Sequence, residues 1–229
     1  MLEALILDFD GVVVDSEPVH MACFRRVLHD PYGLGFTDRE YYEHYLSYTD
    51  AECFAQILRR NGRRFDEDEI RGLVLRKTAL VQEMLSRSAD PLPGAVELMR
   101  SARAAGVWLA ICSAALREEI VLPLRRAKAL ELVQVIVSAE DVKAGKPDPQ
   151  GYNLARRRLS ELAGRELPAG ACVAIEDSPG GIAAVRAAGL RVLGVTNTVA
   201  ADALAAADRV VASLADVTLD DLPKMVGLA

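Results

Sequence analysis

Apolar runs alternate with amphipathic stretches over much of the chain. The runs are ALIL (4–7), VWLAIC (107–112), VQVIV (133–137), CVAI (172–175) and RVLGV (191–195). Runs of this length, without polar alternation, are typical of parallel strands that are covered by helices on both faces. The helical periodicities that separate them from Pro93 onward lie at 94–106, 116–130, 149–164, 178–189 and 200–207. The pattern predicts an α/β fold with a doubly wound parallel sheet.

Residues 17–88 do not follow this alternation. They contain three amphipathic helical patterns, VHMACFRRVLHD (19–30), TDAECFAQILRRNG (49–62) and DEDEIRGLVLRKTALVQEMLS (66–86). In the second pattern, Thr49 and Glu52 have the spacing of a capping box, which marks a helix start. An insertion of about 70 residues is too long for a plain crossover between strands. We therefore expect two domains, an α/β core of residues 1–16 and 89–229 and a helical domain of residues 17–88.

Composition and charge exclude several classes of protein. The hydrophobic fraction of 51% excludes wholesale disorder. A net charge of −6 and a pI near 5.2 provide no electrostatic case for nucleic acid or an anionic membrane as partner. The side chains of Arg156, Arg157 and Arg158 point about 100° apart on a helix, so they cannot form one basic patch. We expect a solvated helix face there.

The cysteines and the N-terminal segment indicate the compartment. The widely spaced Cys23, Cys53, Cys112 and Cys172 form no CxxC pair, which favours small buried side chains over a zinc site or a disulfide framework. No basic segment followed by a long apolar stretch opens the chain, and the apolar runs are shorter than a membrane span. These features predict a cytoplasmic protein without a membrane partner.

Polar side chains follow four of the predicted strands. They are Asp8 and Asp10 after ALIL, Ser113 after VWLAIC, Lys146 in the loop after VQVIV, and Glu176 and Asp177 after CVAI. Because ligands of parallel sheets bind at the carboxyl ends of the strands, we expect one site there. Carboxylate oxygens suit Mg²⁺, and a lysine with a hydroxyl supplies charge and hydrogen bonds for phosphate oxygens. The combination predicts phosphoryl transfer.

The two acids after the first run have separate predicted roles. Asp8 can attack phosphorus once a metal and Lys146 reduce the repulsion between two anions, and an aspartyl-phosphate intermediate results. Asp10 lies two residues further along an extended backbone and so points to the same side. It can protonate the leaving oxygen and then deprotonate the water that cleaves the intermediate.

Each of these residues also has a purely structural interpretation. The Asp10-Gly11 pair is a strong turn signal, and Ser113 before a helix can be its cap. Lys146 before a proline can be an exposed loop charge. The acids before SPGG can be side chains favoured at a helix N-terminus. One site explains all four positions together, whereas the structural interpretations need a separate reason for each.

Four motifs resemble those of the haloacid dehalogenase superfamily. They are DFDGVVVDS (8–16), CSA (112–114), GKPDP (145–149) and IEDSPGGIAA (175–184). Within the superfamily the chain is similar to the β-phosphoglucomutase-like and phosphoglycolate-phosphatase-like branch, and residues 17–88 look like its helical cap. The resemblance implies a Rossmann-like core, a mobile cap that selects the substrate, and Mg²⁺-dependent hydrolysis of a small phosphorylated metabolite. We expect a monomer, the default for a capped enzyme.

The resemblance also implies roles for single residues. Asp8 is the nucleophile and Asp10 the acid and base, while Ser113, Ala114 and Lys146 bind the substrate's phosphate. Asp8, the Asp10 carbonyl, Asp177 and Glu176, directly or through water, hold Mg²⁺. His20, Lys77 and Asp50 are cap residues that face the substrate. The structural interpretation of His20 is an ordinary hinge-region or surface histidine. That of Lys77 is a solvent-exposed lysine among other basic residues of a long helix.

Asp50 bears on the choice between hydrolysis and mutase chemistry. Where β-phosphoglucomutases carry an arginine that binds a second phosphate, this chain has Asp50, whose charge would repel a bisphosphate. We therefore expect hydrolysis of a monophosphate, with a phosphosugar mutase as the alternative. A sugar or polyol phosphate is the expected substrate, and phosphoglycolate-like acids stay open, although Asp50 disfavours a second anionic group. Asp10 argues against a dehalogenase, because attack on carbon needs no second acid.

Two alternatives lie outside the hydrolases. Phospho-accepting signalling modules also combine carboxylates, Mg²⁺, a hydroxyl and a lysine on a parallel sheet. They are shorter than this chain, lack a helical insertion and do not accept the phosphoryl group at the first strand. A catalytically inactive binding protein is the second alternative, although all the expected chemical groups are present.

Overall fold

The computed structural model describes residues 2–45, 48–88 and 90–228. The chain divides into two compact units, one formed by residues 1–15 and 89–229 and the other by residues 16–88. We call the first the α/β unit and the second the helical unit. In the described ranges, none of the helices combines the length and the apolar character that a membrane span requires.

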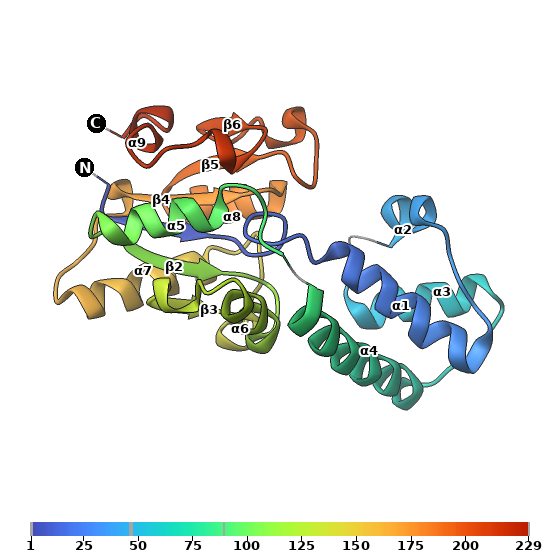
Figure 1. The fold of residues 1–229 in the computed structure, drawn as a ribbon. Helices are drawn as coiled ribbons and strands as arrows, with labels where there is room; N and C mark the ends of the chain where they lie inside the picture. The colour runs from blue at the N-terminus through green and yellow to red at the C-terminus, as the bar shows by residue number, and fades with distance from the viewer. Residues whose placement is uncertain (1, 46–47, 89, 229) are drawn as a thin grey trace. The chain divides into compact units, whose positions relative to one another are not determined.

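The α/β unit is built on a parallel sheet. Among the described residues it has six strands, in the order β3-β2-β1-β4-β5-β6. Their bounds are β1 Ala4–Leu7, β2 Trp108–Cys112, β3 Val135–Val137, β4 Cys172–Glu176, β5 Arg191–Val195 and β6 Arg209–Val211. β1 lies in the interior of the sheet, between β2 and β4 (Figure 1).

Helices cover both faces of this sheet. They are α5 Ala95–Ala104, α6 Arg117–Arg126, α7 Gln150–Ala163, α8 Pro179–Ala187 and α9 Leu222–Met225. Leu5 and Leu7 of β1 pack into an apolar cluster with α5, α6 and α9. Ala4 and Ile6 point to the other face and pack with α7 and α8. The predicted Rossmann-like, doubly wound α/β fold is confirmed.

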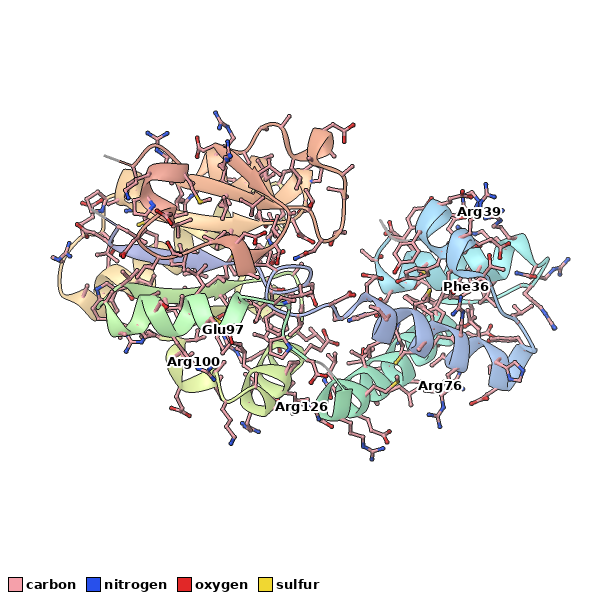
Figure 2. All side chains as sticks on the ribbon, turned by 45° about the horizontal axis from the view of Figure 1, so that its top comes forward. Phe36, Arg39, Arg76, Glu97, Arg100 and Arg126 are labelled. Carbon is pink, nitrogen blue, oxygen red and sulfur yellow. The ribbon has the colours of Figure 1, made fainter. Side chains whose placement is uncertain are left out.

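The helical unit has an apolar core of its own. Its helices in the described residues are α1 Glu17–Tyr32, α2 Asp38–His44, α3 Asp50–Arg60 and α4 Glu67–Ser88. Phe24, Phe54 and Leu73 are buried in its core. Phe36 lies among the side chains of this unit (Figure 2) and stacks on Tyr41, with 5.5 Å between the ring centroids.

Capping boxes open two of these helices. Thr49 accepts a hydrogen bond from the Glu52 N–H at the start of α3, as its spacing predicts. Thr37 and Glu40 form the same motif at the start of α2, which was not predicted. That helix has only 7 residues, which is too short for a clear apolar periodicity, but its capping box was a usable signal.

Two segments near the C-terminus differ from the sequence interpretation. The helix expected at residues 200–207 is only a 3₁₀ turn at Ala201–Leu204. The turn ends because Asp208 pairs with β5: its N–H donates to Val192 O (3.0 Å), and its carboxylate accepts from the Val192 N–H (2.7 Å). The strand β6 was not predicted, since it has 3 residues and all of them are at least partly exposed.

The arginine triplet on α7 is correctly predicted to form no single patch, but it is not simply solvated. Arg158 contacts Asp141 (2.9 Å), Arg156 donates to Leu167 O (2.9 Å), and Arg157 lies near another side chain of its own helix. Arg156 and Arg158 thus connect α7 to other parts of the α/β unit, whereas Arg157 is an exposed side chain that pairs within its own helix. Cys23, Cys53, Cys112 and Cys172 are all buried, as expected, and none of them is part of a disulfide bond.

Candidate active site

Backbone pairing at the carboxyl ends of the strands brings the polar residues together. Asp8 directly follows β1, and its N–H donates to Ile175 O on β4 (3.0 Å). Ser113 directly follows β2, and its N–H donates to Val137 O on β3 (3.0 Å). Glu176 is the last residue of β4. The register of the apolar runs therefore sets where these side chains lie.

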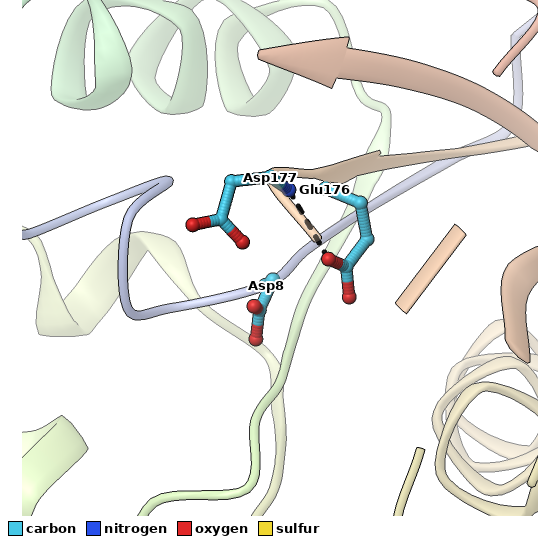
Figure 3. Close-up of side chains that lie close together, drawn as sticks. All are labelled: Asp8, Glu176 and Asp177. Atoms are coloured by element: carbon cyan, nitrogen blue, oxygen red, sulfur yellow. Dashed lines mark hydrogen bonds between the residues drawn. The ribbon is translucent and has the colours of Figure 1, made fainter. Parts of the chain in front are cut away.

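Three carboxylates meet at this edge of the sheet. One oxygen from each of Asp8, Glu176 and Asp177 lies within 4.8 Å of the others (Figure 3). The three residues are 7%, 0% and 5% exposed. Buried negative charges this close together are costly unless positive charge compensates them.

Lys146 supplies one positive charge. Its Nζ lies 2.7 Å from Asp8 Oδ1 and 2.6 Å from Glu176 Oε1, and its side chain is 17% exposed. It is therefore not an exposed loop charge. Burial alone would lower the pKa of this ammonium, but the carboxylates of Asp8 and Glu176 outweigh burial and raise the pKa well above its ordinary value. Lys146 stays positively charged at neutral pH.

One ammonium does not balance the carboxylates. Burial raises the pKa of Asp8 well above its ordinary value, Lys146 lowers it by less, and the neighbouring acids raise it further. Burial also raises the pKa of Asp177, to about 6. A divalent cation would stabilise the charged forms of these groups, and carboxylate oxygens are ligands that Mg²⁺ prefers. The carboxylate oxygens of Asp8 and Asp177 therefore fit Mg²⁺.

A tight turn follows the first strand. The Gly11 N–H donates to Val14 O (2.7 Å), and Gly11 has a φ of +72°. A Cβ at Gly11 would lie 1.8 Å from Asp177 Oδ2, so only glycine lets the backbone pass this close to the carboxylate. The Asp-Gly turn signal is therefore genuine, and the turn is part of the candidate site.

Ser113 connects the second strand to Asp10. Its Oγ lies 3.4 Å from Asp10 Oδ2 and accepts a hydrogen bond from the Ala115 N–H (3.0 Å). The residue that precedes α6 is Leu116, so Ser113 is not the cap of that helix. A cavity of about 280 Å³ next to it has Ser113, Ala114 and Lys146 in its lining. The six core residues predicted from the strand ends thus lie in one region of the α/β unit.

Two supporting residues were not predicted. The amide of Asn197 donates to Gly11 O (2.7 Å), and the hydroxyl of Thr198 donates to a carboxylate oxygen of Asp177. Both residues come just after β5. The other polar residues were located by inspecting the positions just beyond each apolar run, and the same inspection after RVLGV would have found these two. They hold the turn after β1 and the acid after β4.

A second cluster lies inside the helical unit. Lys77 Nζ is 2.5 Å from Asp50 Oδ1, 2.8 Å from His20 Nδ1 and 4.3 Å from the ring centre of Phe24. The Lys77 side chain is 1% exposed, whereas its neighbour Arg76 extends outward (Figure 2). The solvent-exposed interpretation of Lys77 is wrong, because one step of a helix turns the side chain by about 100°, here from solvent to core.

His20 is neutral in this cluster. Burial, and then the charge of Lys77, lower the pKa of His20 to about 3. An ammonium can only donate, so Nδ1 is the acceptor and the ring hydrogen is on Nε2. His20 is therefore partly buried and held by Lys77 rather than free at the surface, and its Nε2–H is a potential donor.

The ion pair also changes what Asp50 can do. Sequence alone assigned this residue an uncompensated negative charge that would repel a second phosphate. In the folded unit the positive charge of Lys77 offsets the negative charge of Asp50. Asp50 therefore does not repel a second phosphate as an unpaired carboxylate would. The Asp50 side chain is 34% exposed and Lys77 only 1%, so the carboxylate is the accessible member of the pair.

Comparisons with known proteins agree with this arrangement. A family model, haloacid dehalogenase-like hydrolase, matches residues 2–189. Protein CbbY of Rhodobacter capsulatus is 33% identical over 198 residues, which cover 84% of each chain. The phosphorylated carbohydrates phosphatase of Thermotoga maritima is 27% identical over 198 residues, 86% of this chain and 87% of the relative. A solved structure of a CbbY mutant from Rhodobacter sphaeroides, in complex with xylulose 1,5-bisphosphate, has a TM-score of 0.83 and 26% identity and covers 97% of this chain and 99% of that one.

Proposed function

Because the chain belongs to the haloacid dehalogenase-like hydrolases, we propose that it is a Mg²⁺-dependent phosphatase that hydrolyses a small sugar or polyol phosphate through an aspartyl-phosphate intermediate. The observation that carries this proposal is the buried group of Asp8, Asp177 and Lys146 at the strand ends. It combines a carboxylate nucleophile, oxygen ligands for a cation and an ammonium within one small volume. Few structural tasks require these three kinds of group together.

In the proposed reaction an oxygen of Asp8 attacks the phosphorus atom of the ester. The bond from phosphorus to the ester oxygen breaks, and Asp10 donates a proton to the departing oxygen. Lys146, 2.7 Å from Asp8 Oδ1, supplies positive charge for the phosphoryl oxygens. Asp10 then accepts a proton from the water that attacks phosphorus, which releases inorganic phosphate and restores Asp8.

The cation has a defined place in this proposal. Asp8, Asp177 and the backbone carbonyl of Asp10 would hold Mg²⁺. When bound, Mg²⁺ offsets negative charge on the transferring group and on the nucleophile. Ser113 and the neighbouring Ala114 would bind the remaining phosphoryl oxygens from the end of β2.

We further propose that the helical unit, the cap predicted at residues 17–88, selects the substrate. His20 offers an N–H donor and Asp50 an accessible carboxylate acceptor, a pair of groups that suits the hydroxyls of a sugar or polyol. The names of the relatives support this class, since one is a phosphorylated carbohydrates phosphatase and another binds xylulose 1,5-bisphosphate. The Lys77–Asp50 pair carries no net charge, which favours monophosphate hydrolysis over a mutase that must bind two phosphates.

Removal of the metal tests the proposed function. EDTA is expected to reduce hydrolysis of p-nitrophenyl phosphate at least about 100-fold, since a bound cation contributes several kcal/mol to the transition state. Added Mg²⁺ in excess should restore the rate, while the far-ultraviolet circular dichroism stays unchanged throughout. Turnover that is insensitive to EDTA would contradict Mg²⁺ dependence. A single phosphorylation event without turnover would favour a signalling module. The absence of any reaction would favour an inactive binding protein.

Asp50→Asn tests the role of the helical unit. The substitution leaves the buried Lys77 ammonium without its carboxylate, so the cluster gains a net positive charge. We expect the ratio of kcat/KM for a sugar 1,5-bisphosphate to kcat/KM for the matching monophosphate to rise about tenfold, because roughly 1.4 kcal/mol of new attraction corresponds to that factor.

A matched control is available in the same unit. Asp38 pairs with Arg25 at 2.5 Å, but its side chain is 71% exposed. Asp38→Asn should leave the substrate ratio within twofold of wild type. If both variants keep the wild-type ratio, the Lys77–Asp50 pair has no part in selecting the substrate.

A further inference from the structure

Tyr152 is buried beside the candidate active site and has no part in the chemistry described so far. It lies in the first turn of α7 and is 0% exposed. Its hydroxyl donates to Glu176 Oε1 at 2.6 Å. The centre of its ring is 5.4 Å from Lys146 Nζ, within the range of a cation–π contact. Tyr152 thus touches both members of the Lys146–Glu176 ion pair.

Glu176 is fully occupied by hydrogen-bond donors. Its Oε1 accepts from Tyr152 and from Lys146 (2.6 Å each). Its Oε2 accepts from the Asp177 N–H (3.1 Å), the Ser178 N–H (3.3 Å) and the Ser178 hydroxyl (3.0 Å). A carboxylate has about four lone-pair positions, so this set of donors leaves neither oxygen available to a cation.

Helix α8 prevents this carboxylate from turning away. A Cβ at Gly181 would lie 1.9 Å from the Glu176 Cδ and 2.0 Å from its Oε2, so the helix backbone is packed directly against the acid. Ser178 is held in turn by the Gly181 N–H, which donates to its hydroxyl (3.1 Å). The orientation of Glu176 is therefore set by α8 on one side and by Tyr152 on the other.

We propose that Tyr152 is a positioning residue for phosphoryl transfer. Its hydroxyl holds Glu176 against Lys146, and Glu176 in turn keeps the ammonium beside Asp8. In this arrangement Asp8 and Asp177 provide the carboxylate ligands of Mg²⁺, and Glu176 provides none. The inference rests on the proposed function and refines it, since the family resemblance implied that Glu176 holds Mg²⁺ either directly or through water.

The position of Lys146 explains why one hydroxyl matters. The ammonium is shared between Asp8 at 2.7 Å and Glu176 at 2.6 Å, so small changes in either acceptor move it. Without the tyrosine hydroxyl, Lys146 is the one remaining donor to Glu176 Oε1 within the described part of the chain, and this oxygen then attracts the ammonium more strongly. The ammonium then moves away from Asp8, and displacements of even 1 Å can cost about 100-fold in rate.

The test compares turnover with direct measurement of Mg²⁺ binding. Tyr152→Phe keeps the ring and removes the hydroxyl. We expect kcat for p-nitrophenyl phosphate to fall about tenfold, KM to change less than twofold, and the Mg²⁺ Kd, measured by titration calorimetry without substrate, to stay within about threefold.

Glu176→Gln should lower kcat further and likewise leave the Mg²⁺ Kd within about threefold. Asp177→Asn should raise that Kd at least about 30-fold.

Tyr32→Phe is the matched control. Tyr32 also donates to a glutamate, Glu69, but both residues belong to the helical unit. It should leave kcat and the Mg²⁺ Kd unchanged.

Three results would overturn the inference. They are an unchanged kcat in Tyr152→Phe, a Mg²⁺ Kd in Glu176→Gln as weak as in Asp177→Asn, and loss of the cooperative thermal transition in Tyr152→Phe, which would make the hydroxyl a structural group. Failure of the proposed function can be distinguished from failure of this inference. In the first case wild-type protein does not hydrolyse p-nitrophenyl phosphate, whatever Mg²⁺ Kd the calorimetry measures.

Discussion

Asp8→Asn is expected to eliminate phosphatase turnover, with a fall in kcat of about 10⁴-fold or more, while the protein remains folded. The amide is close in shape to the carboxylate but cannot attack phosphorus. Burial and neighbouring acids raise the pKa of Asp8 well above its ordinary value, which means that the fold disfavours its charge. A neutral side chain should therefore leave the melting temperature at or above that of wild type.

The measurement is a rate assay together with thermal unfolding of the same preparation. Asp216→Asn is the control, because Asp216 is an exposed acid of the same unit that is not among the residues of the candidate site. It should keep the wild-type rate. An Asp8→Asn protein that retains a tenth or more of the wild-type kcat would remove Asp8 as the nucleophile.

Lys146→Met should affect both catalysis and stability. The substitution keeps an unbranched side chain and removes the ammonium that contacts Asp8 and Glu176. We expect kcat/KM to fall about 10³-fold, in line with the loss of a preorganised charge at a reacting group. The free energy of unfolding at pH 8 should fall by about 3 kcal/mol, because one partner of a buried ion pair is removed and the other remains.

The loss of stability in Lys146→Met has a predictable dependence on pH. Without the ammonium, the pKa of Asp8 in the folded state rises further above its value in the unfolded chain. The folded state then binds the proton more tightly, so stability is lost as pH rises and recovered as pH falls through the folded-state pKa. The deficit relative to wild type should be smaller at pH 5 than at pH 8.

Urea titrations at the two pH values measure this difference. Lys224→Met, at a lysine whose side chain is 78% exposed, should show neither the deficit nor its pH dependence. A deficit in Lys146→Met that is equal at pH 5 and pH 8 would argue against uncompensated carboxylates as its cause.

The fold was predictable where the sequence signal is strong. The runs at 4–7, 107–112, 133–137, 172–175 and 191–195 overlap β1 to β5 to within two residues at each end, because a strand buried on both faces must be apolar at nearly every position. The strand β6 and helix α2 are short, and β6 is also partly exposed, so neither has the apolar period that the others have.

The candidate site was predictable where backbone register alone sets the positions. Asp8, Ser113 and Glu176 follow or end strands that are paired in the sheet, so knowledge of the strands suffices to place them at one edge. Lys146 lies in a loop whose path the apolar pattern does not define. Its place after the run VQVIV made it a candidate, but its contacts with Asp8 and Glu176 could not be predicted from that place. Tyr152 contacts Glu176 only because α7 packs on the sheet, which no local pattern encodes.

The helical unit marks the limit of prediction from one-dimensional patterns. Arg76 and Lys77 are adjacent basic residues, yet only Lys77 is buried, paired with Asp50 on another helix. A long-range ion pair inside a helical core has no signature in the spacing of charges along a single helix. Its recognition required the tertiary contact itself.

The strand order has a consequence for how the protein is made. β1 is synthesised before the other strands of the described sheet, yet it lies between β2 and β4, and β4 ends only at Glu176. On the ribosome, the edge of ALIL that pairs with β4 therefore stays unpaired until residues 172–176 have emerged, while residues 16–88 can already condense around their own core. Such an edge is a site of aggregation in nascent chains. Although Asp8 is translated before the other residues of the candidate site, its surroundings are complete only after β4 has been made.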